Sequence, residues 1–300
     1  NVGVVIAEAQ DANDGVNTFL LEQHVDYKIV FKPSDLEGLK LLILPDNAVI
    51  SEELSSAIKN YYNLGGKIFA SGKSLYGKNF GIEYEDVSIR RYVDYIVPDF
   101  DIGLYGSPLL MNIAAYKTHG EKGGFLPHTA IYEPYFTRTN AHFSGHKNTP
   151  YKEEKSPFAG IYKKKNFTFF AHDVFTVYNK LGSPYLREYI KKELFELYDE
   201  NPVSVKDFSV IGRVRLRKNA AENFYCLHLL YASQSKRQSC YTLEDFPAFY
   251  NTEVTLTLPE KIKRAEFIQT GEILPIKTVN GKATIVIPEW NMHALIVLKY

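Results

Sequence analysis

The sequence predicts an α/β fold, a doubly wound parallel sheet, with a second, smaller all-β domain that forms an antiparallel sandwich. Three observations lead to this prediction. Continuous apolar runs alternate with helical segments over about the first 72 residues. Short strands separated by turn residues fill the last third of the chain. A length of 300 residues is sufficient for two domains, each with its own core.

The first part of the chain is expected to contain four buried strands and two helices. The strands are expected at residues 2–7, 27–31, 39–45 and 67–71, and the helices at 18–25 and 52–64. Ser51 is a predicted N-cap of the second helix, and the pair Gly65-Gly66 is expected to end it. In a sheet of this class, function is expected at the carboxyl ends of the strands.

Residues 75–160 are less regular and rich in Tyr, Gly and Pro, and the α/β pattern returns after them. The run NFTFFAHDVF, residues 166–175, is expected to be another buried strand. Ser183 and Pro184 are expected to open a helix as its N-cap and first residue. The apolar face of that helix consists of Leu186, Tyr189, Ile190, Leu194 and Leu197.

The pattern changes after DENPVSVKD, residues 199–207. Short, often alternating strands are expected in RVRLR, FYCLHLLYA, EVTLTLP, RAEFIQ, ATIVIP and HALIVLKY. Trp290 is interpreted as a core or domain-interface anchor rather than as a platform for sugars. We therefore place an α/β domain at residues 1–206 and a small β-sandwich domain at 207–300.

Composition and charge narrow the function classes. The chain carries 35 Lys and Arg against 35 Asp and Glu, so electrostatic binding to nucleic acid or to an anionic membrane is not expected. No apolar run approaches the roughly 20 residues of a membrane span. Aromatic residues are abundant at 14%, which suits thick cores, subunit interfaces and sugar-stacking surfaces alike.

Two cysteines give no disulfide framework and too few thiolates for a zinc site. We expect no metal and no cofactor. Cys226 is expected to be a small buried apolar residue and Cys240 a loop thiol. No signal peptide is visible, and we expect a cytoplasmic protein. Because the chain starts with NVGVVIAEA, inside a strand, we also expect that it was cut from something longer.

Residues 41–77, LLILPDNAVISEELSSAIKNYYNLGGKIFASGKSLYG, resemble part of a known family. A strand ending in Leu-Pro, a helix, Gly-Gly-Lys and a strand are similar to the β-galactosidase trimerisation domain, a relative of class I glutamine amidotransferases with a flavodoxin-like sheet. The segment FTFFAHDVFTVYNKLGSPYLREYIKKEL looks like that domain's closing strand and helix. The tail from VRLRKNAAENFYCLHLL to WNMHALIVLKY resembles the small β domain that ends such glycoside hydrolases. The resemblance implies homo-oligomerisation and a place beside a carbohydrate site.

An amidotransferase would require a nucleophilic cysteine at the turn after the fourth strand. That turn reads Ala70-Ser71-Gly72-Lys73-Ser74, without a cysteine. Ser71 or Ser74 with His172 and Asp173 is the alternative, a self-contained hydrolase. Because adjacent residues point in different directions, His172 and Asp173 are not expected to form one relay. We predict no catalytic residues in this chain.

The middle segment also contains His142 and His146, four residues apart, with His128 and Glu133 nearby in sequence. A metal-dependent enzyme is therefore a second alternative, although Ser144 and Gly145 favour a loop and no third ligand is obvious.

A binding surface is the preferred interpretation of this segment. Residues 132–151 are expected to form an exposed or crevice-lining surface near the carboxyl ends of the parallel strands. Tyr135, Arg138, His142 and His146 would bind a carbohydrate, with rings for sugar faces and donors for hydroxyls or carboxylates. The opposing interpretation is an ordered loop whose histidines bond to backbone carbonyls.

We therefore expect a non-catalytic assembly or accessory region of a β-galactosidase-like glycoside hydrolase. Its expected partners are further copies of itself and a candidate carbohydrate ligand, with no nucleic acid and no membrane. A carbohydrate-binding module acting alone is the third alternative.

Overall fold

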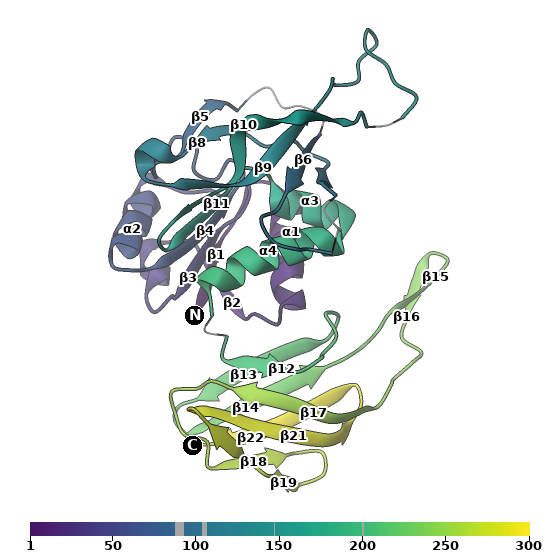
Figure 1. Cartoon of the computed structure of the whole chain (residues 1–300). Helices are drawn as coiled ribbons and strands as arrows, with labels where there is room; N and C mark the ends of the chain where they lie inside the picture. The colour runs from purple at the N-terminus through teal and green to yellow at the C-terminus, as the bar shows by residue number, and fades with distance from the viewer. Residues whose placement is uncertain (88–92, 104–106, 147, 200) are drawn as a thin grey trace. The chain divides into compact units, whose positions relative to one another are not determined.

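A computed structural model describes residues 1–87, 93–103, 107–146, 148–199 and 201–300. The chain divides into two compact units. The first contains Asn1–Phe19 and Tyr27–Asp199, and the second contains Leu20–Asp26 and Glu200–Tyr300. Figure 1 gives the element labels used below.

The first unit is built on a mixed sheet that has nine strands in the described part of the chain. In spatial order they are β2 (Tyr27–Val30), β1 (Val2–Val5), β3 (Leu41–Leu44), β4 (Lys67–Ser71), β11 (Phe167–Phe170), β10 (Tyr151–Lys164), β9 (Leu126–Pro134), β6 (Asp94–Val97) and β7 (Leu109–Met111). The pairs from β2 to β11 are all parallel, and the pairs from β11 to β7 are all antiparallel. The expectation of a wholly parallel sheet is therefore correct only for its first five strands.

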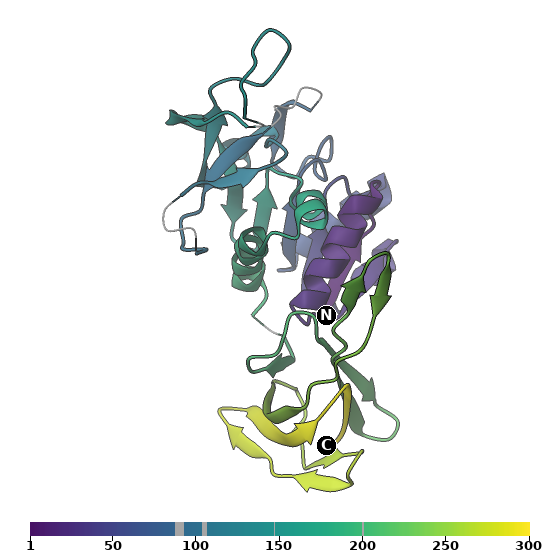
Figure 2. The same ribbon diagram turned by 90° about the vertical axis from the view of Figure 1, so that its right-hand side faces the viewer.

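Helices lie on both faces of the parallel part. They are α1 (Gln10–Glu22), α2 (Glu52–Asn63), α3 (Val174–Leu181) and α4 (Pro184–Leu197). Leu54 and Ile58 of α2 share a core with Leu42 and Ile68 of the sheet. On the other face, Phe175 of α3 contacts Phe69, and Tyr189 of α4 contacts Phe170. In Figure 2, α1, α3 and α4 stand in front of the sheet.

Local sequence explains where these helices begin. The Ser51 hydroxyl accepts a hydrogen bond from the Leu54 amide, and Ser183 caps α4 in the same way with Pro184 at its first position. The face predicted for α4 is buried, as expected. The segment expected to be strand up to residue 175 behaves differently, because β11 ends at Phe170 and α3 begins at Val174.

The middle of the chain is more regular than expected. It supplies β6, β7, β9 and β10 to the large sheet, and a separate ribbon of β5 (Glu83–Asp86) with β8 (Lys117–His119). Two short 3-10 helices lie at Pro33–Leu36 and Glu121–Gly123. The strand β10 runs for 14 residues through Glu, Lys, Ser and Pro, with register shifts against β9. Such a segment has neither a continuous apolar run nor clean alternation, so its sequence does not identify it as a strand.

The second unit contains two antiparallel sheets with one core. One sheet consists of β12 (Val203–Val205), β17 (Phe249–Leu256), β21 (Lys282–Trp290) and β20 (Lys277–Val279). The other consists of β13 (Arg213–Asn219), β14 (Phe224–Leu230), β22 (His293–Lys299), β18 (Arg264–Phe267) and β19 (Glu272–Leu274). Val254 and Ile285 of the first sheet pack in the same cluster as Leu227 and Ile296 of the second. Residues 201–300 contain no helix.

Trp290 lies in this core, as its sequence position indicates. Its ring stacks on Phe249 with centroids 4.6 Å apart, and its indole N–H donates to the Thr252 hydroxyl at 2.8 Å. A separate ribbon, β15 (Ser235–Arg237) with β16 (Cys240–Thr242), carries the exposed Cys240. Cys226 is only half-buried, in contrast to the expectation, because it lies on a strand whose alternate residues face the core.

Among the described residues, no helix is long and apolar enough to cross a membrane.

Candidate functional site

The carboxyl ends of the parallel strands bring polar side chains from distant parts of the sequence to one edge of the sheet. Asp46 follows β3, Ser71 ends β4, and His172 and Asp173 follow β11. In open α/β sheets, ligands bind at this edge, outside the carboxyl ends of the strands. We call it the carboxyl edge.

Asp46 is a fully buried carboxylate with two donors. The Ser71 hydroxyl donates to its Oδ1 at 2.5 Å, and the Thr176 amide, in the first turn of α3, donates to its Oδ2 at 2.7 Å. Burial, and next the negative charge of Asp173, raise the pKa of Asp46 to about 7, against the opposing effect of the two hydrogen bonds. The carboxyl group of Asp46 therefore titrates near neutral pH, above the usual range of an aspartate.

Gly72 leaves room for the Asp173 carboxylate beside the turn after β4. It has a φ of +59°, and a Cβ there would lie 2.1 Å from the Asp173 Oδ1. The Tyr84 hydroxyl donates to the Gly72 carbonyl oxygen at 2.8 Å and closes the turn from outside. The turn after β4 is thus packed on both sides.

The Ser–His–Asp relay considered from the sequence is not formed. Ser71 is fully buried and its hydroxyl is bonded to Asp46 rather than to His172. His172 is also fully buried and its Nε2 bonds to the Asp94 Oδ1 at 2.8 Å, not to Asp173. In the part of the chain that the structure describes, the Ser74 hydroxyl is buried without a hydrogen-bond partner. Neither serine is arranged as a nucleophile with a base.

Asp94 connects the buried His172 to the antiparallel half of the sheet. The strand β6 begins at Asp94 and runs antiparallel to β9, which has the same direction as β11, so Asp94 lies at the carboxyl edge. Its Oδ2 accepts from the Ala115 amide at 2.8 Å. The next amide, that of Tyr116, donates to the Ala171 carbonyl at the end of β11. The segment before β8 is thereby held against the parallel strands.

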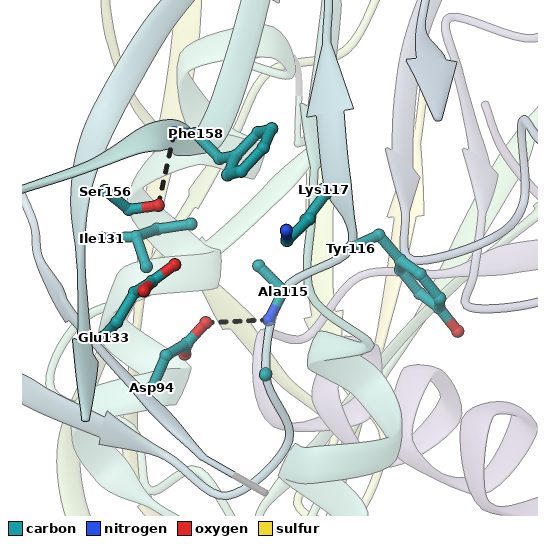
Figure 3. A pocket seen from close by; sticks show the side chains of 9 residues that line it. Asp94, Ala115, Tyr116, Lys117, Ile131, Glu133, Ser156 and Phe158 are labelled. Atoms are coloured by element: carbon teal, nitrogen blue, oxygen red, sulfur yellow. Dashed lines mark hydrogen bonds between the residues drawn. The ribbon is translucent and has the colours of Figure 1, made fainter. Parts of the chain in front are cut away.

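A small hollow opens beside Asp94, and Figure 3 shows it from close by. We call it the Lys117 hollow. It has a volume of about 30 Å³, sufficient for about one water molecule. Its walls include Asp94, Lys117, Ile131, Glu133, Ser156 and Phe158. In Figure 3 the Lys117 amine lies across the hollow from the carboxylates of Glu133 and Asp94.

The four residues predicted to bind a carbohydrate lie in the connection from β9 to β10, residues 135–150, which we call the 135–150 loop. Since β9 runs in the direction of β11, this loop leaves the sheet at the carboxyl edge, and Figure 1 shows it projecting beyond β9 and β10. Tyr135, His142 and His146 are exposed and Arg138 is half-exposed. One residue of the predicted surface, Lys147, lies outside the described residues.

Contacts within the loop pair aromatic rings with basic side chains. The Arg138 guanidinium lies over the ring of Phe143 at 4.9 Å, and the rings of Phe136 and His142 are 6.1 Å apart. Within the described residues, no hydrogen bond, ion pair or ring contact joins Tyr135, Arg138, His142 and His146 to one another. Arg138 is not buried in an internal ion pair, so the loop is not a core plug held by its charge.

A metal centre has no support from the geometry. Across the described ranges, no group of three or more His, Cys, Asp or Glu side chains is arranged to hold a metal ion. His128, considered as a third ligand, lies 3.5 Å from Asp99, while the loop around His142 and His146 is exposed.

Sequence reasoning missed Asp46, Asp94 and the walls of the Lys117 hollow. Asp46 did have a signal, since it follows a buried strand and Pro45 at the edge where such sheets place polar groups. Asp94 had none, because its partner His172 is 78 residues away.

No family model matches the chain, and no curated protein matches it. Solved structures do match. The α-L-fucosidase isoenzyme 2 from Paenibacillus thiaminolyticus is similar with a TM-score of 0.89 and 25% identity, over 100% of this chain and 48% of that one.

Two β-galactosidases are similar at lower identity. The enzyme from Bacillus circulans sp. alkalophilus has a TM-score of 0.59 and 14% identity, over 100% of this chain and 41% of that one. The cold-adapted enzyme from Rahnella sp. R3 has a TM-score of 0.53 and 12% identity, again over 100% and 41%. The chain therefore has the fold of a part of these glycoside hydrolases and spans less than half of each.

Proposed function

We propose that this chain is a non-catalytic assembly and accessory region of a β-galactosidase-like glycoside hydrolase in the cytoplasm. One observation carries the proposal. At the carboxyl edge, where a hydrolase of this fold has its nucleophile, Ser71 is buried and bonded to Asp46, and His172 is buried and bonded to Asp94. A nucleophile must reach substrate and its base, and here both groups are engaged inside the protein.

The finer assignment, also proposed, is a β-galactosidase trimerisation domain with an amidotransferase-like doubly wound sheet, followed by a small β domain. Its support is the order β2-β1-β3-β4-β11 with helices on both faces. This order has the switch between β1 and β3 that flavodoxin-like sheets have. The similarity to less than half of a fucosidase and of β-galactosidases agrees with an accessory role.

The 135–150 loop is the proposed contact with a carbohydrate or with a neighbouring copy. Its sequence, YFTRTNAHFSGHKNTP, contains no acidic residue, and Tyr135, Phe136 and Phe143 are exposed. Rings with adjacent guanidinium and imidazole groups suit sugar faces and the hydroxyls or carboxylates around them.

The catalytic claim is tested on the purified chain with aryl β-galactosides, aryl α-L-fucosides and glutamine. We expect no turnover of any of them above that of a Ser71→Ala variant, because neither a nucleophile nor a paired-carboxylate site is in place. Hydrolysis that Ser71→Ala or Ser74→Ala abolishes in a folded variant would contradict the proposal and restore the hydrolase alternative.

Binding by the loop is a separate measurement. Calorimetric titration with oligosaccharides, neutral and uronate-containing, is expected to show binding that Arg138→Ala with Tyr135→Ala weakens. A monomeric chain that binds sugar in this way, without assembly, would instead favour the carbohydrate-binding module.

A further inference from the structure

The Lys117 hollow lies outside the 135–150 loop and plays no part in the function proposed above. Its walls come from four separate strands: Asp94 from β6, Lys117 from β8, Glu133 from β9, and Ser156 and Phe158 from β10. Polar groups from distant segments that face one small space are a common feature of ligand sites.

Among the described residues, the ammonium group of Lys117 has no ion-pair partner. Within the described ranges, the interaction recorded for the Lys117 ammonium is with the ring of Phe158, at 5.4 Å from the ring centroid, and no carboxylate lies within ion-pair distance of it. Three ammonium protons therefore remain for water or a ligand.

The opposite wall is made of acceptors. The Glu133 side chain is 16% exposed, and the Lys152 ammonium lies 3.4 Å from its Oε2. Asp94 is buried, with its oxygens bonded to His172 and to the Ala115 amide. The Ser156 hydroxyl, which is the acceptor of a long bond from the Phe158 amide at 3.4 Å, adds a group that both donates and accepts.

This arrangement selects among ligand groups. An ammonium group donates only and would meet the Lys117 charge, and a carboxylate accepts only and would meet the two acidic side chains. A neutral hydroxyl accepts from Lys117 and donates to Glu133 at the same time. The hollow is therefore chemically matched to a hydroxyl group.

The volume of the hollow and the residues at its mouth indicate what the rest of the ligand is. About 30 Å³ admits a single hydroxyl-sized group, so the remainder of any ligand must lie at the mouth. There it meets apolar surface from the half-buried ring of Phe158. A pyranose carries hydroxyls on its rim and an apolar C–H face, which is the combination that this surface fits.

We propose that the Lys117 hollow binds a neutral pyranose through one of its hydroxyl groups. The site is separate from the 135–150 loop, and the proposal depends only on the residues that line the hollow.

The test is saturation-transfer NMR and calorimetric titration of the full chain with D-galactose and L-fucose, and with D-galacturonate as the charged comparison. We expect saturable binding of a neutral sugar at millimolar concentration, of about the strength that a few hydrogen bonds supply. Lys117→Met and Glu133→Gln are expected to weaken it at least about tenfold, because each removes a charged hydrogen-bond partner. Galacturonate is expected to bind more weakly than galactose.

The matched control is Lys122→Met, because Lys122 is 83% exposed and pairs with Glu83 away from the hollow. It is expected to leave binding unchanged, and equal melting temperatures of the three variants and the parent chain show that all are folded. Absence of saturable binding up to about 100 mM sugar overturns the proposal. So does binding that survives Lys117→Met and Glu133→Gln but is lost with Tyr135→Ala and Arg138→Ala, which assigns the sugar to the loop.

Discussion

At the scale of single residues, the polar side chains of the carboxyl edge are hydrogen-bonded inside the protein instead of facing a ligand. As in a nucleophile turn, the turn after β4 has a serine next to a glycine with positive φ, but here the serine is fully buried. The carboxyl group of Asp46 accepts a hydrogen bond from the hydroxyl of Ser71, while Asp94 is hydrogen-bonded to the imidazole of His172. These two hydrogen bonds stabilise the fold and engage Ser71 and His172 inside the protein, so the two groups do not form a nucleophile and its base.

Gly72→Ala is predicted to destabilise the first unit by at least about 3 kcal/mol, because it adds a clash to an unfavourable left-handed φ. The new Cβ would lie 2.1 Å from the Asp173 Oδ1. Gly77→Ala is the matched control, with a φ of +70° and no atom within 4 Å of its Cβ. It is expected to cost only about 1 kcal/mol. Urea unfolding measures both, and equal losses would contradict the packed turn.

Asp46 is predicted to make the stability of the chain decrease as the pH rises from about 4 to 7. The unfolded side chain ionises near pH 4, whereas burial and the neighbouring Asp173 raise the folded pKa to about 7. Between these values the folded state binds more protons, so the free energy of unfolding falls with increasing pH. In Asp46→Asn this fall is expected to be smaller by at least about 1 kcal/mol, since an amide does not titrate.

The control for this pH dependence is Asp35→Asn. Hydrogen bonds from two backbone amides lower the pKa of Asp35. Its contribution to the free energy of unfolding therefore changes below pH 4, and not between about pH 4 and 7, where that of Asp46 changes. Urea unfolding at intervals between about pH 4 and 8 is the measurement. Identical slopes for Asp46→Asn and the parent chain would show that Asp46 is ionised in the folded state.

At the scale of elements, the parallel strands and their helices could be predicted because each carries its signal locally. Continuous apolar runs identify β1, β3 and β11, and serine caps identify the starts of α2 and α4. The antiparallel half could not be predicted. The strand β10 alternates poorly, and its pairing with β9 depends on contacts that no spacing in the sequence reveals.

The same limit applies to the candidate site. Tyr135, Arg138, His142 and His146 could be singled out because they share one short segment, and the structure places them on an exposed loop. Their binding role stays a prediction. The Asp94–His172 pair and the Lys117 hollow are assembled from separate strands, so they emerge only from the folded arrangement.

The cap of α2 provides a prediction for a whole element. Ser51→Ala is expected to destabilise the first unit by about 1 kcal/mol, because the hydroxyl accepts from the Leu54 amide at 3.1 Å and its loss leaves that donor unpaired. Ser56→Ala is the control, since its exposed hydroxyl only donates to the Glu52 carbonyl within the helix. Its expected effect is within about 0.5 kcal/mol. Thermal unfolding of both variants separates a capping role from a general effect of losing a serine.

At the scale of the whole molecule, the first unit carries the carboxyl edge with the loop and the hollow, and the second has an independent core of its own. Apolar surface remains on both units. Phe143 and Tyr135 in the first are 71% and 59% exposed, and Tyr241 in the second is 66% exposed. A formal net charge of zero offers no general repulsion between copies. These features favour association of the chain with itself.

We therefore predict that the purified chain self-associates at micromolar concentration. Light scattering coupled to gel filtration is expected to give a mass that is a multiple of 34.3 kDa, as closed symmetric assembly requires. Replacing both loop rings, Tyr135→Ser with Phe143→Ser, is expected to lower the association constant at least about tenfold, since exposed aromatic rings are frequent interface anchors. Leu64→Ser, at an 81% exposed position that ends α2, is the control and is expected to leave the mass unchanged. A strict monomer at high concentration would count against the assembly role. An oligomer whose mass the loop variant does not change would show that the interface lies outside the 135–150 loop.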